Sequence, residues 1–325
     1  MRIAVLCSAH GFGHLTRQLA ICEQLVQLGA RPEVFTAAPG EVVHDYLPDL
    51  PVIPWTIDVG IAQSDSVTED LPRTRQLLAQ RCSEQAIQAL VEALADFDLA
   101  VVDTAPPALE ACRRRGLPCV AVGNFDWAWT YAHYPQLQDW SRRFARWQAP
   151  HRAIRLQPGP PLSHFSQVRE VGLVARTRPA HRLPAGSVLV SFGGFGLNDL
   201  GDLLPQLPGV TWVLSPPMQR LERPDVLWVE GVSYPALVAG ADLVLTKPGY
   251  GILAEASAAG TPLAWIPRGA FPEAQFLVRA LKARGDREIG DDLPEIVRQL
   301  RGAPRAIPSL DNRRVAELIL DLIPA

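Results

Sequence analysis

Short apolar runs alternate with helical segments along the chain, and this alternation constrains the fold more than any other feature. The first half contains runs such as IAVLC and LAVVD, which are apolar almost without interruption. A strand that is buried on both faces has this character, and neighbouring parallel strands are joined by a helical crossover. A second series, from SVLVSFGG to PLAWIP, repeats the pattern. The sequence therefore predicts an α/β protein with two Rossmann-like domains, each a doubly wound parallel sheet.

The stretch between the two series predicts the domain boundary. The chain has 325 residues, enough for two domains of ordinary size, and three prolines fall within residues 156–163. We therefore expect an N-terminal domain at residues 1–160 and a C-terminal domain at 161–308. Within the first domain, apolar spacings of three and four predict one long helix from Leu71 to Leu94. In residues 309–325 the pattern DNRRVAELILDLI predicts a docked amphipathic helix.

Charge and cysteine content argue against several classes of protein. The formal net charge is -3 and the pI is about 6.2, which does not fit a general nucleic-acid binder. The five cysteines are odd in number and show no CxxC spacing, so we expect reduced structural thiols and no metal site. The chain starts without a signal-peptide pattern, and no apolar stretch is long enough to span a bilayer. We therefore expect a cytoplasmic protein without integral membrane association.

The loop after the first strand, AHGFGHLT, is the first candidate for a binding site. Ligands of open parallel sheets bind beyond the carboxyl ends of the strands, and two such domains place those ends at an interdomain cleft. A dinucleotide fingerprint would need a third glycine where Thr16 stands, which disfavours NAD. Gly11 and Gly13 still let the backbone approach a ligand, and a neutral His14 can accept a proton from a hydroxyl. Alternatively, His14 only forms a hydrogen bond across the domain and His10 caps the turn.

The segment TKPGYGILAEASAAG is a second glycine-rich turn between a strand and a helix. The helix start around Gly249 and Gly251 exposes N–H groups that suit a diphosphate, assisted by the charge of Lys247. Glu255 lies one turn into that helix, where its carboxylate can accept hydrogen bonds from ribose hydroxyls. The alternative is a glutamate that simply faces solvent.

Further polar residues lie close to strands of the second series. Arginine suits bidentate contact with phosphate, and hydroxyl and amide groups donate to it. Candidates for the phosphates are Arg176, Ser191, Gly193 and Gly194. Glu273 and Gln275, in RGAFPEAQF, are candidates for reading sugar hydroxyls.

Two segments of the first domain suggest where a second substrate binds. Asp103 ends the strand LAVVD and is, with His14, a candidate general base; the alternative is a cap for the next helix. The segment NFDWAWTYAHY combines flat aromatic faces with polar groups, which suits a sugar or a similar ligand. Its candidate acceptor-binding residues, together with His10, Gly11 and Gly13, are Asn124, Asp126, Trp127 and His133. The alternative is an aromatic plug between the domains.

With these motifs the chain resembles the GT-B glycosyltransferases, and more narrowly their MurG-like branch. HGFGHLTRQLAI and KPGYGILAEASAAGTP are similar to its glycine-rich loop and donor signature. VGNFDWAWTYAHY and VSFGGFG resemble the glycosyltransferase-like N-terminal domain of plant-type L-arabinokinases and of their bacterial relatives. The resemblance implies an inverting transfer from a nucleotide-diphosphate sugar, with UDP the expected nucleotide and no cofactor or metal. It also implies that the C-terminal helix packs on the first domain.

The resemblance implies roles for individual residues. Glu255 would bind the donor ribose, Gln275 the sugar, and the backbone at Val232 the edge of the base, with His14 near the reacting centre. Contacts to the diphosphate would come from Arg176, Ser191 and the amides of Gly193 and Gly194.

The chain departs from the MurG-like pattern at several points. Its first loop has a shorter glycine run, and the paired glutamines of the family are reduced to Gln275. The hydrophobic, basic membrane patch of that branch has no counterpart, so we expect a small soluble acceptor. Two other functions remain open, a nucleotide-sugar hydrolase or epimerase on the same fold and a non-catalytic nucleotide-sugar-binding protein. A homodimer is also compatible with the sequence.

Overall fold

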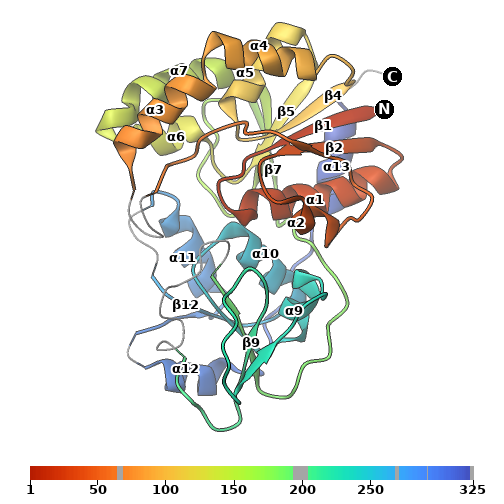
Figure 1. The fold of residues 1–325 in the computed structure, drawn as a ribbon. Helices are drawn as coiled ribbons and strands as arrows, with labels where there is room; N and C mark the ends of the chain where they lie inside the picture. Colours follow the sequence, from red (N-terminus) through yellow and green to blue (C-terminus); the bar gives the residue numbers. More distant parts are fainter. Residues whose placement is uncertain (64–68, 193–203, 268–270, 291, 323–325) are drawn as a thin grey trace. The chain divides into compact units, whose positions relative to one another are not determined.

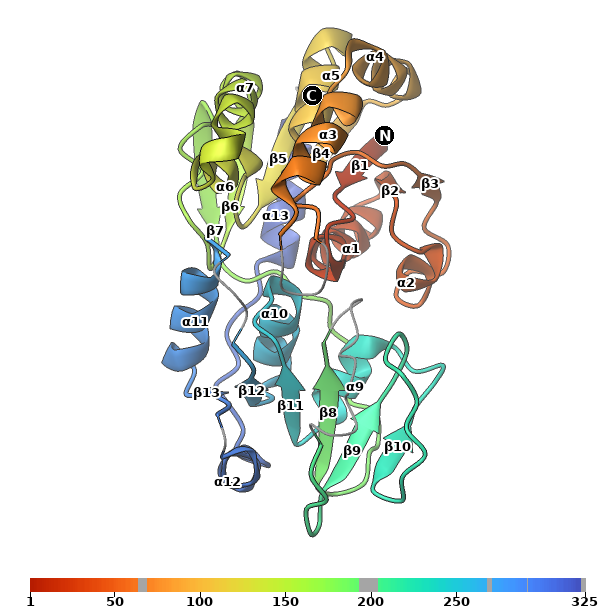
Figure 2. The ribbon, with the colours of Figure 1, turned by 60° about the vertical axis from the view of Figure 1, so that its left-hand side comes forward.

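The computed structural model describes residues 1–63, 69–192, 204–267, 271–290 and 292–322. The chain divides into two compact units (Figures 1 and 2). The first unit comprises Met1–Val174 and Leu310–Ala325, and the second comprises Ala175–Ser309. The boundary that we expected after residue 160 is therefore wrong, because the first sheet continues beyond it.

The first unit is built on a seven-stranded sheet in the order β3-β2-β1-β4-β5-β6-β7. All neighbouring strands are parallel. The strands are β1 (Arg2–Cys7), β2 (Arg31–Thr36), β3 (Val52–Pro54), β4 (Leu99–Asp103), β5 (Cys119–Gly123), β6 (Arg152–Leu156) and β7 (Gln167–Val171). The strand order reverses between β1 and β4, and such a switch point is where open parallel sheets bind ligands.

Helices cover both faces of this sheet. They are α1 (Phe12–Gln27), α2 (Gly40–His44), α3 (Leu71–Arg81), α4 (Glu84–Ala93), α5 (Pro106–Arg115), α6 (Trp127–Ala132), the 3-10 turn η1 (Pro135–Leu137), α7 (Gln138–Gln148) and α13 (Asn312–Leu320). On one face, α1 and α13 pack together, and Leu19, Val315 and Ile319 share one core cluster with the strands (Figure 1). On the other face, Leu90 of α4 and Leu109 of α5 belong to a second cluster.

Two parts of the first unit differ from the sequence-based expectation. The long helix expected from Leu71 to Leu94 is two helices, because Ser83 interrupts it and caps α4 by accepting a hydrogen bond from the Ala86 amide at 3.2 Å. The stretch expected to separate the domains contains α7 and β6, and β7 follows it. The sequences RAIRL and QVREV of these strands interleave charged and apolar residues, which fits the outer positions of a sheet.

The second unit repeats the plan with a six-stranded parallel sheet in the order β10-β9-β8-β11-β12-β13 (Figure 2). Its strands are β8 (Ser187–Ser191), β9 (Thr211–Leu214), β10 (Val226–Trp228), β11 (Leu243–Thr246), β12 (Leu263–Trp265) and β13 (Arg287–Glu288). Its helices are α9 (Tyr234–Gly240), α10 (Tyr250–Ala259), α11 (Ala274–Ala283) and α12 (Leu293–Leu300). The expected fold class, two doubly wound parallel sheets, is confirmed. The helix expected from Asp199 begins outside the described residues.

The packing of α13 on the first unit leads to a stability prediction. Ile319 is fully buried in the core that α13 shares with α1. Replacing Ile319 with Ala is expected to cost about 2–5 kcal/mol, because the change leaves a cavity. Urea unfolding of the full chain would measure the loss, with Arg314→Ala as an exposed control on the same helix that changes stability by less than about 0.5 kcal/mol. Equal, small effects of both changes would show that α13 does not contribute to this core.

Candidate active site

The switch point of the first sheet is formed by the residues that follow β1 and β4. Gly11 precedes α1 with φ 86°, a left-handed backbone conformation that favours glycine. This turn lets α1 start directly after β1, and His14 then lies in the first turn of α1 and is buried. Asp103 is the last residue of β4 and is completely buried. The sheet order therefore brings together the two residues that the sequence proposed as candidate bases.

His14 and Asp103 are in direct contact, and Arg17 joins them. Asp103 Oδ1 lies 2.8 Å from His14 Nδ1. Arg17 sits three residues after His14 on the same face of α1 and donates to both carboxylate oxygens, from Nε to Oδ2 at 2.8 Å and from Nη2 to Oδ1 at 2.5 Å. Arg17 Nη2 also lies 2.6 Å from His14 Nδ1. The sequence analysis identified His14 and Asp103 but missed Arg17.

Neutral side chains complete the environment of Asp103. Gln18 Nε2 donates to Asp103 Oδ2 at 2.9 Å, and the Thr104 hydroxyl donates to Oδ1 at 3.3 Å. Burial alone would raise the pKa of Asp103, but the charge of Arg17 and the contacts with His14 outweigh it and hold that pKa well below its usual range. Asp103 is therefore an ionised carboxylate in the protein interior.

This geometry gives His14 the arrangement of a general base. When Nδ1–H donates to Asp103, the other ring nitrogen, Nε2, has its lone pair available for a proton. Within the described ranges, His14 Nε2 forms no hydrogen bond to the protein. A carboxylate that orients the ring and stabilises the imidazolium is the same arrangement that activates histidine in hydrolases.

Asp58 is a further carboxylate near His14, and the sequence analysis missed it. Its Oδ1 accepts a hydrogen bond from the Ser8 hydroxyl and its Oδ2 accepts one from Trp127 Nε1, each at 2.9 Å. Burial raises the pKa of Asp58 more than His14 and these two donors lower it. Asp58 follows β3, so the rule that directed attention to β1 and β4 also covers it. A strand of only three residues gave too weak a signal for the rule to be applied there.

Aromatic rings surround His14 and His10. The Trp127 ring stacks near His14 at 6.3 Å between centroids and meets the edge of the His10 ring at 5.4 Å. Trp127 is only 2% exposed, so it is a wall of packed protein rather than an open platform for a ligand. Gly60 leaves room for His10, because a Cβ there would lie 2.3 Å from the imidazole Cγ.

The remaining residues of the expected acceptor segment have structural tasks. Asp126 is fully buried and caps α6 by accepting a hydrogen bond from the Trp129 amide at 2.8 Å. Asn124 is buried and donates to the carbonyl groups of Leu156 and Pro158, while its oxygen accepts from Arg17. His133 is exposed after the end of α6 and contacts the Trp129 carbonyl at 2.9 Å. These contacts favour the packing interpretation of this segment over a direct acceptor surface. Gly13, the second residue of α1, is half-buried.

The switch point of the second sheet lies between β8 and β11. Ser191 ends β8, and the Thr246 hydroxyl at the end of β11 donates to the Ser191 carbonyl at 2.7 Å. The Tyr234 hydroxyl, from the start of α9, donates to the Ser191 hydroxyl. Burial raises the pKa of Tyr234, so this hydroxyl remains a neutral donor.

Arg176 and Glu255 form a buried ion pair in the second unit. Arg176 Nε donates to Glu255 Oε1 at 2.7 Å, and the two side chains are each 3% exposed. Burial raises the pKa of Glu255, and the charge of Arg176 offsets only part of that. The alternative of a solvent-facing Glu255 is therefore wrong. The sequence analysis gave the two residues separate roles and did not anticipate their contact.

The other residues proposed for the donor occupy varied positions in the second unit. Gly249 precedes α10, and Lys247 and Gly251 are half-buried beside it. Val232 packs against the core cluster around α9 and α10. Glu273 is buried before α11, whereas Gln275 is exposed and donates to the Pro272 carbonyl at 3.1 Å. Gly193 and Gly194 lie outside the described residues.

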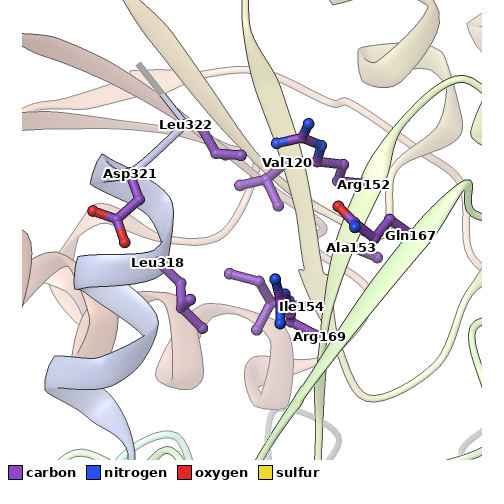
Figure 3. Close-up of a pocket in the computed structure, with 9 residues that line it drawn as sticks. All are labelled: Val120, Arg152, Ala153, Ile154, Gln167, Arg169, Leu318, Asp321 and Leu322. Atoms are coloured by element: carbon purple, nitrogen blue, oxygen red, sulfur yellow. The ribbon is translucent and has the colours of Figure 1, made fainter. Parts of the chain in front are cut away.

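A cavity of about 220 Å³ lies elsewhere in the first unit, between the end of α13 and the strands β5, β6 and β7 (Figure 3). Its lining includes Arg152, Arg169 and Leu318, and no residue proposed from the sequence borders it. Over the described ranges, no group of three or more histidine, cysteine, aspartate or glutamate side chains is arranged to hold a metal ion. The helices within these ranges are also too short or too polar to cross a membrane.

Comparison with known proteins places the fold. No protein-family model matches the chain. An L-arabinokinase of Arabidopsis thaliana is 29% identical over 308 residues, which is 86% of this chain but only 29% of that protein. The chain thus spans less than a third of that relative.

Solved structures match the chain over nearly its whole length. They include the glycosyltransferase of kitacinnamycin (TM-score 0.67, 19% identity, 99% of both chains) and the glycosyltransferase SnogD from Streptomyces nogalater (0.62, 19%, 99% of both chains). A third is the spinosyn rhamnosyltransferase SpnG complexed with thymidine diphosphate (0.56, 18%, 99% of this chain and 95% of that one). These likenesses and the two parallel sheets confirm the expected GT-B fold.

Proposed function

We propose that this chain, which has the GT-B fold, transfers a sugar from a nucleoside-diphosphate sugar to a hydroxyl group of a small soluble acceptor, with inversion. One observation carries most of the proposal, the buried contact between His14 and Asp103 at the switch point of the first sheet. A transferase needs a base for the acceptor hydroxyl, and this pair is built to take a proton. The fold and the similarity to an L-arabinokinase support the same class of reaction.

We place the donor in the second unit. Arg176 can neutralise phosphate charge, and the N–H groups at the start of α10, next to Lys247, suit a diphosphate. Glu255 is positioned with Arg176 and can accept hydrogen bonds from ribose hydroxyls. Two structurally similar glycosyltransferases, VinC and SpnG, were crystallised with thymidine diphosphate, which supports a pyrimidine nucleotide here. UDP and dTDP are therefore the first nucleotides to test.

The proposed reaction is a single displacement at the anomeric carbon. The acceptor oxygen attacks while its proton moves to His14 Nε2, and Asp103 stabilises the imidazolium that forms. The bond from the anomeric carbon to the diphosphate breaks through an oxocarbenium-like state. The negative charge that develops on the diphosphate is met by Arg176 and by the amides at the start of α10. Attack from the face opposite the leaving group inverts the configuration.

A second candidate is a protein that binds a nucleotide sugar without turning it over. The Arg176–Glu255 ion pair favours this possibility, because each side chain already satisfies the other. The two functions differ in a direct assay. A transferase releases nucleotide and forms a glycoside when donor and acceptor are both present, and the anomeric configuration of that glycoside, read by NMR, tests inversion. A binding protein gives neither product, and a hydrolase releases free sugar without acceptor.

Nucleotide binding is the first measurable consequence. UDP or dTDP at about 100 times its Kd is expected to raise the free energy of unfolding by about 2.7 kcal/mol. A thermal-shift titration would detect this as an increase in Tm of several degrees. UMP and dTMP are matched controls, because they lack the second phosphate that the α10 start and Arg176 would hold. If neither diphosphate stabilises the protein more than its monophosphate, the proposed donor site is wrong.

A further inference from the structure

Arg17 places a permanent positive charge between the two partners of the proposed base. Its side chain is 4% exposed and contacts both oxygens of Asp103 and the Nδ1 atom of His14, at 2.5 to 2.8 Å. Its remaining nitrogen, Nη1, donates to Asn124 at 3.1 Å. The guanidinium is thus fixed on several sides and cannot turn away from the ring without breaking these contacts.

The charge of Arg17 changes what Asp103 does to His14. A buried carboxylate without a cationic partner strongly favours the protonated form of an adjacent imidazole. A histidine that is already protonated cannot take the proton of an acceptor hydroxyl. Arg17 satisfies the charge of Asp103 and also lies beside the ring, so both effects oppose an additional positive charge on His14.

The other titratable groups around the ring do not cancel this effect. Asp58 interacts with His14 electrostatically and favours its protonation, although burial raises the pKa of Asp58 and weakens its tendency to ionise. The buried Cys7 thiol, whose pKa burial raises well above its usual value, stays neutral. Among the described neighbours of His14, Arg17 is therefore the cation that sets its charge.

We propose that Arg17 is a positioning residue that keeps His14 neutral and able to accept a proton, by pairing with Asp103 and bordering the imidazole. This inference rests on the proposed function, because it assigns Arg17 a role in the same transfer reaction. Arg17 lies one turn after His14 in HLTR, so a single turn of α1 provides both the base and the group that controls its charge.

The variant Arg17→Gln tests the inference, because glutamine can still donate a hydrogen bond to Asp103 but carries no charge. The acid limb of the turnover profile is expected to move to higher pH by about one unit or more. Below that limb each unit of movement lowers turnover about tenfold, and the rate recovers at alkaline pH. Gln18→Met is the matched control, since Gln18 donates to the same carboxylate without charge. Its profile is expected to keep the wild-type midpoint.

A measurement without substrate separates this inference from the proposed function. NMR titration of histidine-labelled protein, with the His14 signal assigned from a His14→Asn variant, reports the protonation midpoint of the ring directly. Arg17→Gln should raise that midpoint and Arg17→Lys, which keeps the charge, should stay close to wild type. These shifts are expected even if no sugar transfer is found. An unchanged or lower midpoint in Arg17→Gln, or an equal shift in Gln18→Met, would overturn the inference, and Arg17→Lys provides the test if Arg17→Gln does not fold.

Discussion

Asparagine in place of His14 is expected to lower the rate of sugar transfer about 10³-fold and to leave nucleotide affinity unchanged. The amide can fill most of the space of the imidazole and can donate to Asp103 as Nδ1–H does, but it cannot take up a proton. The chemical step would then depend on water as the base. Turnover measured with saturating donor and acceptor, together with calorimetric titration of UDP or dTDP, would give the two quantities separately.

His133→Asn is the control for this prediction. The sequence placed His133 on the acceptor surface, but the structure shows an exposed side chain that contacts the carbonyl of Trp129. We therefore expect the His133 variant to keep wild-type turnover. If His14→Asn retains turnover within threefold of wild type, His14 is not the base, and the half-buried Asp58 would become the next candidate.

The fold could be predicted largely because its central strands are buried on both faces. IAVLC and LAVVD read as apolar runs, and their order along the chain implies parallel pairing. The outer strands β6 and β7 escaped prediction for the same physical reason. One face or edge of each is exposed, so arginine and glutamate interrupt the apolar pattern. Missing those strands moved the expected domain boundary to residue 160.

The candidate site could be predicted to the extent that topology determines it. His14 and Asp103 follow the two strands at the switch point, and parallel pairing of β1 with β4 brings their ends together. The contact of Arg176 with Glu255 joins residues far apart in the sequence, and no spacing rule connects them. Caps such as Asp126 are also invisible to a search for polar residues after strands. A carboxylate that satisfies backbone amides has the same sequence signature as one that binds a ligand.

Methionine in place of Arg176 is expected to destabilise the second unit by about 3–5 kcal/mol. The reason is the position of Glu255, which would remain in the interior with no cation beside it. Replacing both residues with apolar side chains, in Arg176→Met with Glu255→Leu, is expected to restore most of the stability, because no buried charge is left. Urea unfolding of the single and double variants gives the comparison.

The pH dependence of Arg176→Met provides an independent check of the sign. Burial already raises the pKa of Glu255, and removing Arg176 takes away the charge that partly offsets this increase. A group with a raised pKa in the folded state favours folding at pH below its unfolded value and loses that contribution as the pH rises through the folded value. The single variant should therefore recover stability as the pH is lowered from 7 towards 4.5, whereas the double variant should not.

The same two variants distinguish a structural ion pair from a donor site. If Arg176 and Glu255 hold the nucleotide as proposed, the double variant folds but binds UDP and dTDP much more weakly than wild type. The buried pair would then be an arrangement that positions both groups for the diphosphate and ribose, at a cost in stability that packed apolar residues would avoid. Wild-type nucleotide affinity in a well-folded double variant would reduce the pair to a structural role and would place the donor elsewhere in the second unit.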